Sequence, residues 1–166
     1  MTYDDAIAYL HSFTNYEQVR DAKAMAGITL ERMARLCHQL GDPQRGFRSV
    51  LVAGTNGKGS ICAMLYAMLR ESSLRVGLYT SPHLEHLRER IRVWNPAAGA
   101  SEQPQEADWI SADAFARILG RLQPILEGMR QDGAGGAPTY FEVLTALAFV
   151  YFDEQQVDIA VLEVGL

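Results

Sequence analysis

The residue types best suited to chemistry are concentrated in one glycine-rich stretch, which reads Gly54, Thr55, Asn56, Gly57, Lys58, Gly59, Ser60. Glycine has no Cβ atom, so a backbone of this composition can bring its N–H groups close to an anion. Lys58 adds a positive charge on a long, mobile side chain. The stretch therefore predicts a phosphate-binding loop in which Lys58 is the catalytic cation. The alternative is an ordinary turn with a surface lysine.

The segments on either side of this loop indicate how it is held. Val50, Leu51 and Val52 form a short apolar run that is typical of a strand buried on both faces of a parallel sheet. After the loop, apolar residues recur at the spacing of one helix face: Ile61, Met64, Leu65, Met68 and Leu69. Strand, loop and helix thus follow one another directly. The free N–H groups and the dipole at the start of such a helix also attract anions.

The loop departs from the common phosphate-loop pattern G-x-x-x-x-G-K-[ST] at two positions. Val52 stands where that pattern has glycine, and Gly59 stands where it has a hydroxyl that binds Mg²⁺. Ser60 lies one place too late. Because Mg²⁺ needs oxygen ligands, either Ser60 turns inward or another part of the chain supplies the oxygen.

Two later residues are candidates for that oxygen. Ser81 follows an apparent strand, Arg75 to Thr80, at the carboxyl end where open parallel sheets bind ligands. Within this strand, Gly77 predicts a close approach of another part of the chain. Glu163 interrupts the apolar strand pattern of Val157 to Val164, and a carboxylate inside a central strand is costly unless it is paired or bound to metal. We therefore expect Glu163 to belong to a site.

Other polar groups are weaker candidates. His83 and His86 have a spacing that zinc pairs use, but no third soft ligand is suitably placed in the sequence. The charge-dense stretch Glu85 to Arg92 is expected to be solvated, with Arg88 or Arg90 within reach of an anionic substrate. Two cysteines lie far apart on apolar helix faces, which favours buried free thiols in a reducing compartment.

The rest of the chain alternates helices with loops. The predicted helices begin at Thr2, Thr29, Ser111 and Thr139, each a capping residue, and Asp5 and Glu142 complete capping boxes. Pro124 is expected to kink or divide the third of these helices. Four strands, near Val50, Val76, Ile91 and Ile159, separated mostly by helices, predict an α/β sandwich with a largely parallel sheet.

Length and composition narrow the class of protein. A chain of 166 residues with 48% hydrophobic residues predicts one globular domain. A formal net charge of −5 argues against a general binder of nucleic acids or membrane surfaces. The N-terminal region has no apolar signal segment, and no apolar run approaches the length of a membrane span. A cytoplasmic protein, expected to be a monomer without nucleic-acid or membrane partners, is the resulting prediction.

Several motifs, taken together and in order, resemble one enzyme family. The stretch Gly54 to Ser60 is similar to the ATP loop of the Mur ligase superfamily, and the extra glycine after Lys58 resembles the folylpolyglutamate synthase/dihydrofolate synthase branch. The other motifs that carry this resemblance are Tyr79-Thr80-Ser81-Pro82-His83-Leu84, Glu89-Arg90-Ile91, Pro138-Thr139-Tyr140-Phe141-Glu142 and Leu162-Glu163-Val164-Gly165-Leu166.

The resemblance implies an ATP-dependent ligase that adds L-glutamate to dihydropteroate or to a folate polyglutamate through an acyl phosphate. It implies that residues 54–60 bind ATP and that Ser81 and Glu163 bind Mg²⁺. It further implies two groups of contacts to the pterin substrate: Ala26, Gly27 and Ile28, and Pro138, Thr139, Tyr140 and Phe141. For residues 26–28 a surface connection is the favoured alternative, and for Thr139 a capping role is an equally direct explanation.

The resemblance also implies a fold and an extent. The fold would be a P-loop NTPase-like three-layer sandwich, and residues 1–166 would be the N-terminal part of the ATP-binding domain, without the C-terminal domain. The chain ends just before the family's Gly-Gly-Arg-Leu-Asp continuation, so the 166 residues alone are expected to have little or no ligase activity. Two alternatives stay open at this point: a Mur-type ligase that acts on a UDP-linked peptidoglycan precursor, and an inactive nucleotide-binding fragment.

Overall fold

The computed structural model describes residues 1–16, 30–98, 107–132 and 136–165. These residues fall into two compact units. One combines Met1–Gln44 with Ala112–Tyr151, and the other combines Arg45–Ser111 with Phe152–Leu166. We call them the helical unit and the sheet unit.

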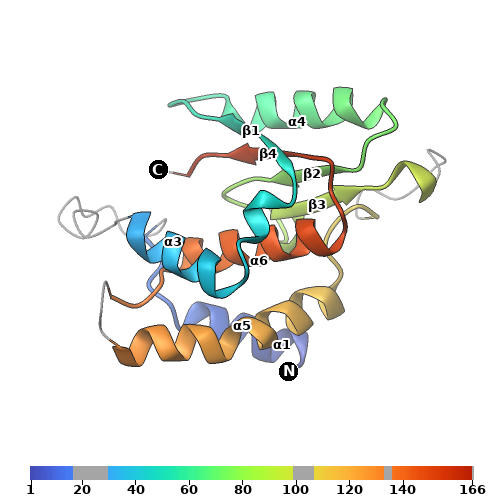
Figure 1. Ribbon diagram of the computed structural model, residues 1–166. Helices are drawn as coiled ribbons and strands as arrows, with labels where there is room; N and C mark the ends of the chain where they lie inside the picture. The colour runs from blue at the N-terminus through green and yellow to red at the C-terminus, as the bar shows by residue number, and fades with distance from the viewer. Residues whose placement is uncertain (17–29, 99–106, 133–135, 166) are drawn as a thin grey trace. The chain divides into compact units, whose positions relative to one another are not determined.

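The sheet unit contains four strands, β1 (Arg48–Val52), β2 (Val76–Tyr79), β3 (Ile91–Trp94) and β4 (Ile159–Glu163) (Figure 1). Their order in the sheet is β1-β4-β2-β3. Strands β1 and β2 both run parallel to β4, whereas β3 pairs antiparallel with β2. The prediction of an α/β fold with a mainly parallel sheet, with strands at these four places, is confirmed.

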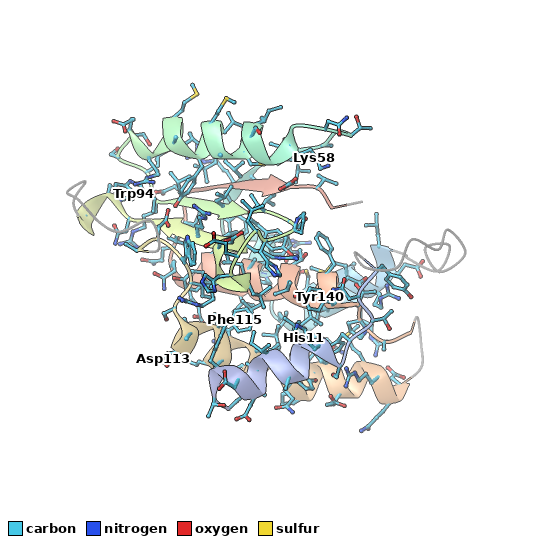
Figure 2. All side chains as sticks on the ribbon, turned by 180° about the vertical axis from the view of Figure 1, so that it is seen from behind. His11, Lys58, Trp94, Asp113, Phe115 and Tyr140 are labelled. Atoms are coloured by element: carbon cyan, nitrogen blue, oxygen red, sulfur yellow. The ribbon has the colours of Figure 1, made fainter. Side chains whose placement is uncertain are left out.

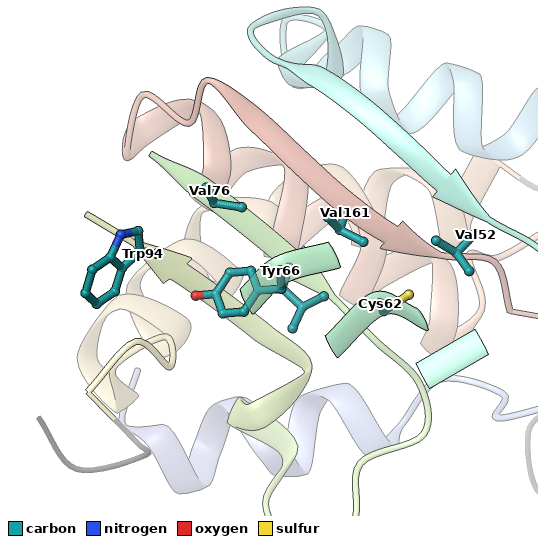
Figure 3. Close-up of a cluster of buried hydrophobic side chains, with 7 residues drawn as sticks. Val52, Cys62, Tyr66, Val76, Trp94 and Val161 are labelled. Atoms are coloured by element: carbon teal, nitrogen blue, oxygen red, sulfur yellow. The ribbon is translucent and has the colours of Figure 1, made fainter. Parts of the chain in front are cut away.

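Helix α4 (Lys58–Arg70) packs against one face of this sheet through an apolar cluster (Figure 3). The helix contributes Cys62 and Tyr66, and the strands contribute Val52, Val76, Leu78, Trp94 and Val161. The Tyr66 hydroxyl donates to Asp108 Oδ2 at 2.8 Å, and the Arg70 guanidinium lies 4.2 Å from the centre of the Trp94 ring. These contacts fix the orientation of α4, and with it the position of the loop that precedes it.

Two expectations about burial are wrong. Strand β1 is not buried on both faces, since Leu51 is 68% exposed. Among the described strands, β1 lies at one edge of the sheet and has β4 as its one neighbour. On α4, the side chains Ile61, Met64 and Met68 are exposed, although their spacing predicts a core-facing stripe. The reason is that α4 turns Cys62 and Tyr66 toward the sheet, so that of the predicted stripe only Leu65 and Leu69 pack against the apolar cluster.

Gly77 in β2 does mark a close approach. A Cβ atom at this position would lie 3.1 Å from Phe152 Cε1 and 3.2 Å from the Ala160 Cβ. Phe152 also makes an edge-to-face contact with Phe47, at 5.6 Å between ring centres.

The helical unit consists of α1 (Tyr3–His11), α3 (Leu30–Gln39), α5 (Ala112–Asp132) and most of α6 (Tyr140–Glu154). The predicted capping box of Thr2 and Asp5 is present. Helix α5 runs without interruption through Pro124, so this proline does not divide it. Leu30 is exposed at the start of α3, whereas Leu36 and Cys37 of the same helix are buried.

Three short 3-10 helices complete the described structure: η1 (Pro43–Arg45), η2 (Leu87–Arg90) and η3 (Pro96–Ala98). None of the helices in the described ranges has both the length and the apolar character needed to cross a lipid bilayer. Cys37 and Cys62 are both buried and free, as predicted.

Candidate nucleotide and metal site

The glycine-rich loop connects β1 to α4 and is open to solvent. Gly54, Thr55, Asn56 and Gly57 are exposed, and Lys58 is half-buried at the first position of α4 (Figure 2). Gly57 precedes the helix with a φ of 75°, a conformation that suits glycine. Because glycine has no side chain, it does not cap the start of the helix. The first N–H groups of α4 are thus left for an incoming anion.

The Lys58 side chain turns back over this loop. Its Nζ donates to the Gly54 carbonyl oxygen at 2.9 Å. This hydrogen bond joins the two ends of the exposed loop. A phosphate oxygen that reached the ammonium group would be a stronger acceptor than the carbonyl.

Glu163 and Ser81 lie together at the same edge of the sheet. Glu163 is the last residue of β4, is 8% exposed, and accepts the Ser81 N–H on Oε2 at 3.1 Å. A Cβ atom at Gly59 would lie 3.8 Å from the same Oε2. The carboxylate therefore sits beside the first turn of α4, at the carboxyl ends of the three parallel strands.

This arrangement suits a hard divalent cation. A buried carboxylate beside a hydroxyl residue and a glycine-rich loop offers oxygen donors of the kind that Mg²⁺ prefers, so Glu163 and Ser81 are the residues that would hold the ion. In the ranges that the structure describes, no three histidine, cysteine, aspartate or glutamate side chains are grouped closely enough to hold a metal ion by themselves. The spacing of His83 and His86 thus has no third ligand there to make a zinc site.

The stretch Glu85 to Arg92, expected to be solvated, contains two buried charges. Glu89 is 8% exposed and Arg90 is 2% exposed. The Glu89 carboxylate accepts the main-chain N–H groups of Leu84, Glu85 and His86. Burial by itself raises its pKa, but these N–H donors and Arg92 together hold the pKa of Glu89 below its ordinary value.

Arg90 contributes to the same local structure. Its Nε donates to His83 Nδ1 at 2.9 Å, and its carbonyl oxygen accepts the Thr80 N–H at 3.0 Å. We call residues 81–90, closed by this last bond, the serine loop. The sequence analysis quoted Glu89 within the motif Glu89-Arg90-Ile91 but missed its role; a local signal is its position three residues after His86, where the structure forms a capping box.

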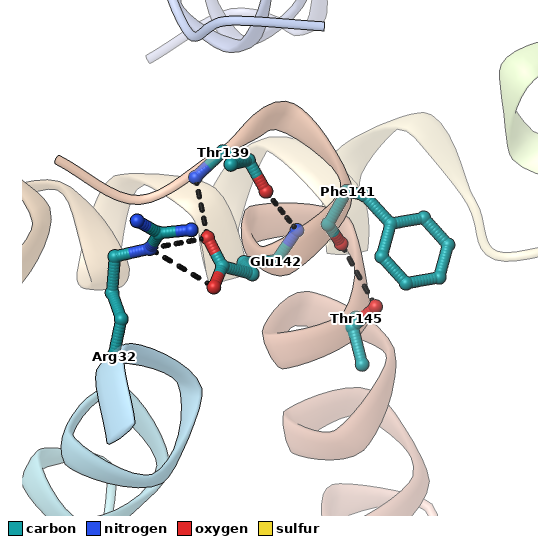
Figure 4. A network of polar contacts seen from close by, with 5 residues as sticks. All are labelled: Arg32, Thr139, Phe141, Glu142 and Thr145. Atoms are coloured by element: carbon teal, nitrogen blue, oxygen red, sulfur yellow. Dashed lines mark hydrogen bonds and ion pairs between the residues drawn. The ribbon is translucent and has the colours of Figure 1, made fainter. Parts of the chain in front are cut away.

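The candidate substrate residues near Thr139 lie in the helical unit. Thr139 Oγ1 accepts the Glu142 N–H at 3.2 Å, and Glu142 Oε2 accepts the Thr139 N–H at 2.7 Å, so the predicted capping box is present (Figure 4). Glu142 also forms a buried ion pair with Arg32 of α3, at 2.8 Å. Sequence reasoning did not single out Arg32, because one arginine within an amphipathic helix is ordinarily exposed.

The neighbouring candidates differ in accessibility. Pro138 and Tyr140 are buried, and the Tyr140 ring stacks on the His11 ring at 6.0 Å between centres (Figure 2). Phe141 is only half-buried, so it is the more accessible of the two aromatic candidates. Ala26, Gly27 and Ile28 lie outside the described residues.

The geometry of the sheet unit defines a class of protein: an α/β protein with a glycine-rich loop between a parallel strand and a helix and a buried carboxylate beside it, an arrangement that is typical of nucleotide-binding proteins. The comparisons with known proteins identify the family within this class. No family model matches the chain.

Curated relatives match the whole chain but are much longer. The chain is 41% identical to the probable bifunctional folylpolyglutamate synthase/dihydropteroate synthase of Haloferax volcanii, over 100% of this chain and 17% of the relative. It is 38% identical to the folylpolyglutamate synthase of Lacticaseibacillus casei, over 100% of this chain and 34% of the relative. The chain thus spans about a third or less of the length of these relatives.

Solved structures agree with these relatives. A crystal structure of folylpolyglutamate synthase from Thermotoga maritima matches with a TM-score of 0.79 and 36% identity, over 99% of this chain and 33% of that one. A complex of folylpolyglutamate synthase with AMPPCP and folate matches with a TM-score of 0.77 and 38% identity, over 100% of this chain and 36% of that one. The chain belongs to the folylpolyglutamate synthase/dihydrofolate synthase family, has the fold of Mur-type ligases, and corresponds to part of the length of its members.

Proposed function

We propose that this chain holds the Mg²⁺-ATP of a ligase that joins L-glutamate to the carboxylate of a folate or of dihydropteroate. The observation that carries the proposal is the convergence of Glu163, Ser81 and Gly59 beside an exposed phosphate loop. The missing hydroxyl at position 59 is compensated, in this account, by Ser81 from the next strand.

The named residues then have separate roles. Lys58 and the N–H groups at the start of α4 hold the β- and γ-phosphates, and Lys58 exchanges its bond to the Gly54 carbonyl for one to phosphate. Glu163 and Ser81 supply protein oxygens to Mg²⁺. When bound, the cation offsets negative charge that develops on the transferred phosphoryl group.

The proposed reaction has two steps. A carboxylate oxygen of the acceptor attacks the γ-phosphorus of ATP, and ADP leaves, which gives an acyl phosphate. The amine nitrogen of L-glutamate then attacks the acyl carbon, the phosphate leaves with the bonding electron pair, and the nitrogen loses a proton. The relatives named as folylpolyglutamate synthases and the complex with AMPPCP and folate support a folate acceptor. Thr139 and Phe141 are our candidates for contact with its ring system.

A trapping experiment tests both steps. It uses a polypeptide of the relatives' full length that carries these 166 residues, which we call the ligase-length polypeptide. With ATP, Mg²⁺ and L-glutamate, mass spectrometry should detect the glutamylated acceptor, tested separately with dihydropteroate and a folate. With hydroxylamine in place of glutamate, the acyl phosphate should be captured as a hydroxamate, and the Lys58→Ala variant should form neither product.

The outcomes discriminate between the alternatives. Ligation on a UDP-linked peptide but on neither pterin acceptor would favour a peptidoglycan ligase. ATP binding without any ligation would leave a nucleotide-binding protein. The 166 residues alone should form no product, because they cover about a third of the length of the ligases they match. The cytoplasmic location inferred from the sequence stays a prediction.

A further inference from the structure

The serine loop is held together by the carboxylate of Glu89, which is not one of the proposed Mg²⁺ ligands. Glu89 lies at the end of the loop opposite Ser81 in sequence, yet its side chain turns inward and accepts three successive main-chain N–H groups, those of Leu84, Glu85 and His86. Its own carbonyl oxygen accepts Arg92 Nε at 3.0 Å. A carboxylate satisfied by three main-chain donors holds those donors in one arrangement, since each lost bond would leave a buried charge less well solvated.

The two ends of the serine loop are also fixed. The Thr80 N–H donates to the Arg90 carbonyl oxygen at 3.0 Å, which closes the loop at its base. The Ser81 N–H donates to Glu163 Oε2 at 3.1 Å, which joins the loop to β4. Ser81 is therefore held on one side by β4 and on the other by a loop whose shape depends on Glu89.

We propose that Glu89 is a positioning residue for the metal site: it fixes the serine loop so that the Ser81 side chain is presented to the Mg²⁺-nucleotide next to Glu163. This inference rests on the proposed function, because it needs the cation to bind at Ser81 and Glu163. Groups that orient metal ligands without touching the metal commonly change metal affinity about 10- to 100-fold when they are mutated.

The Glu89→Gln variant tests this role with little change in volume. A glutamine side chain has one acceptor oxygen and one NH₂ group. The NH₂ group would face main-chain N–H donors, and it cannot accept a hydrogen bond from them. In the ligase-length polypeptide, we expect the Mg²⁺ concentration that half-saturates the enhancement of AMPPCP binding to rise about tenfold or more. AMPPCP affinity without Mg²⁺ should stay unchanged, because the phosphate loop is not altered.

The chain offers a matched control. Glu85 belongs to the same loop and is exposed, so Glu85→Gln removes the same charge without removing the internal acceptor. Glu85→Gln should leave the Mg²⁺ requirement unchanged, which separates positioning from a general effect of negative charge on a cation. Hydrogen exchange of the amides of residues 84–86 should become faster in Glu89→Gln and not in the control.

Ser81→Ala completes the test as a double-mutant cycle. If Glu89 acts through Ser81, adding Glu89→Gln to Ser81→Ala should cause no further change in the Mg²⁺ requirement. Fully additive effects, an unchanged Mg²⁺ requirement in Glu89→Gln, or an equal loss of Mg²⁺-free AMPPCP binding would each overturn the inference. If Ser81→Ala itself leaves the Mg²⁺ requirement unchanged, the proposed metal site fails instead, so the two failures are distinguishable.

Discussion

Lys58 has two partners available to it, one within the protein and one in the proposed ligand. In the structure its ammonium group donates to the Gly54 carbonyl oxygen, an uncharged acceptor. A phosphate oxygen is the stronger acceptor, because the bond is then between opposite charges. Because the loop is exposed, a phosphate oxygen from solvent is able to reach the ammonium group and compete with the carbonyl for it.

The first prediction follows for Lys58→Ala in the ligase-length polypeptide. We expect turnover to be abolished, because the charge that faces the transferred phosphoryl group is removed. Steady-state assay of ADP release with saturating acceptor and glutamate measures this. Retention of more than about a tenth of wild-type turnover, equivalent to a loss of less than 1.4 kcal/mol in the transition state, would contradict the assigned role.

Cys62 lies in the first turns of α4, near the same site, and its thiol should be unreactive. Burial and, next, the nearby Glu163 carboxylate raise its pKa from 9.0 to about 11. Burial and, next, Asp42 likewise raise the pKa of Cys37 to about 11. A thiol-specific reagent at pH 8 should therefore modify neither cysteine in the native chain and both in denaturant. Rapid modification of native Cys62 would show that α4 does not pack as described.

The same pKa shifts predict how stability depends on pH. The folded state holds the thiol protons more tightly than the unfolded state. The contribution of these protons to the free energy of unfolding is therefore fully present below about pH 9 and is lost as pH rises toward about 11. Denaturant unfolding at pH 8 and pH 10 should show lower stability at pH 10, and serine at both positions should reduce this difference.

At the scale of elements, β2 depends on the absence of a side chain at Gly77. A Cβ atom there would lie within 3.2 Å of both Phe152 and Ala160, closer than ordinary van der Waals contact. We expect Gly77→Ala to lower the free energy of unfolding by about 1–3 kcal/mol, as overpacked cores do. Urea denaturation measures it, and Gly128→Ala is the control, because in the described residues no atom from outside the neighbouring helix backbone lies within 4 Å of a Cβ at that helical position. Equal stability of Gly77→Ala and wild type would contradict the described packing.

Sequence patterns predicted where the helices and strands lie better than they predicted which side chains are buried. The apolar run Val50 to Val52, the glycine loop and the helical period after it gave β1, the phosphate loop and α4 where the structure has them. The same period did not reveal which flank of α4 faces the sheet, so Ile61, Met64 and Met68 were misassigned to the core. Periodicity identifies apolar positions, but burial depends on neighbours that are distant in the sequence.

The candidate site shows the same limit. The family resemblance implied that Ser81 and Glu163 are neighbours, and the structure brings them together because parallel strands have their carboxyl ends at one edge of a sheet. The role of Glu89 was not predicted, because its partners are main-chain N–H groups, and the residue that it caps with, His86, is not one of the side chains that ordinarily signal a helix start. A run of charges in sequence is ordinarily solvated, and here tertiary structure buries two of them.

For the whole molecule, the residues of the proposed nucleotide site lie within the sheet unit, and the candidate substrate residues near Thr139 lie within the helical unit. Helix α6 begins in the helical unit, and its last three residues, from Phe152 to Glu154, belong to the sheet unit. A ligand that binds only the folded sheet unit stabilises it by mass action, by about 2.7 kcal/mol at a concentration 100-fold above its dissociation constant. Nucleotide binding should therefore slow amide exchange most strongly in β1, β4 and α4.

The most direct test of the central claim is the Mg²⁺ dependence of nucleotide binding with and without the Glu163 carboxylate. Calorimetric titration of AMPPCP into the ligase-length polypeptide should show that Mg²⁺ strengthens binding about tenfold or more, which corresponds to 1.4 kcal/mol or more. In Glu163→Gln this strengthening should be lost, while the Mg²⁺-free affinity is retained. Equal strengthening by Mg²⁺ in both proteins would contradict the assignment of Glu163, and absence of AMPPCP binding to the wild type would contradict the nucleotide site itself.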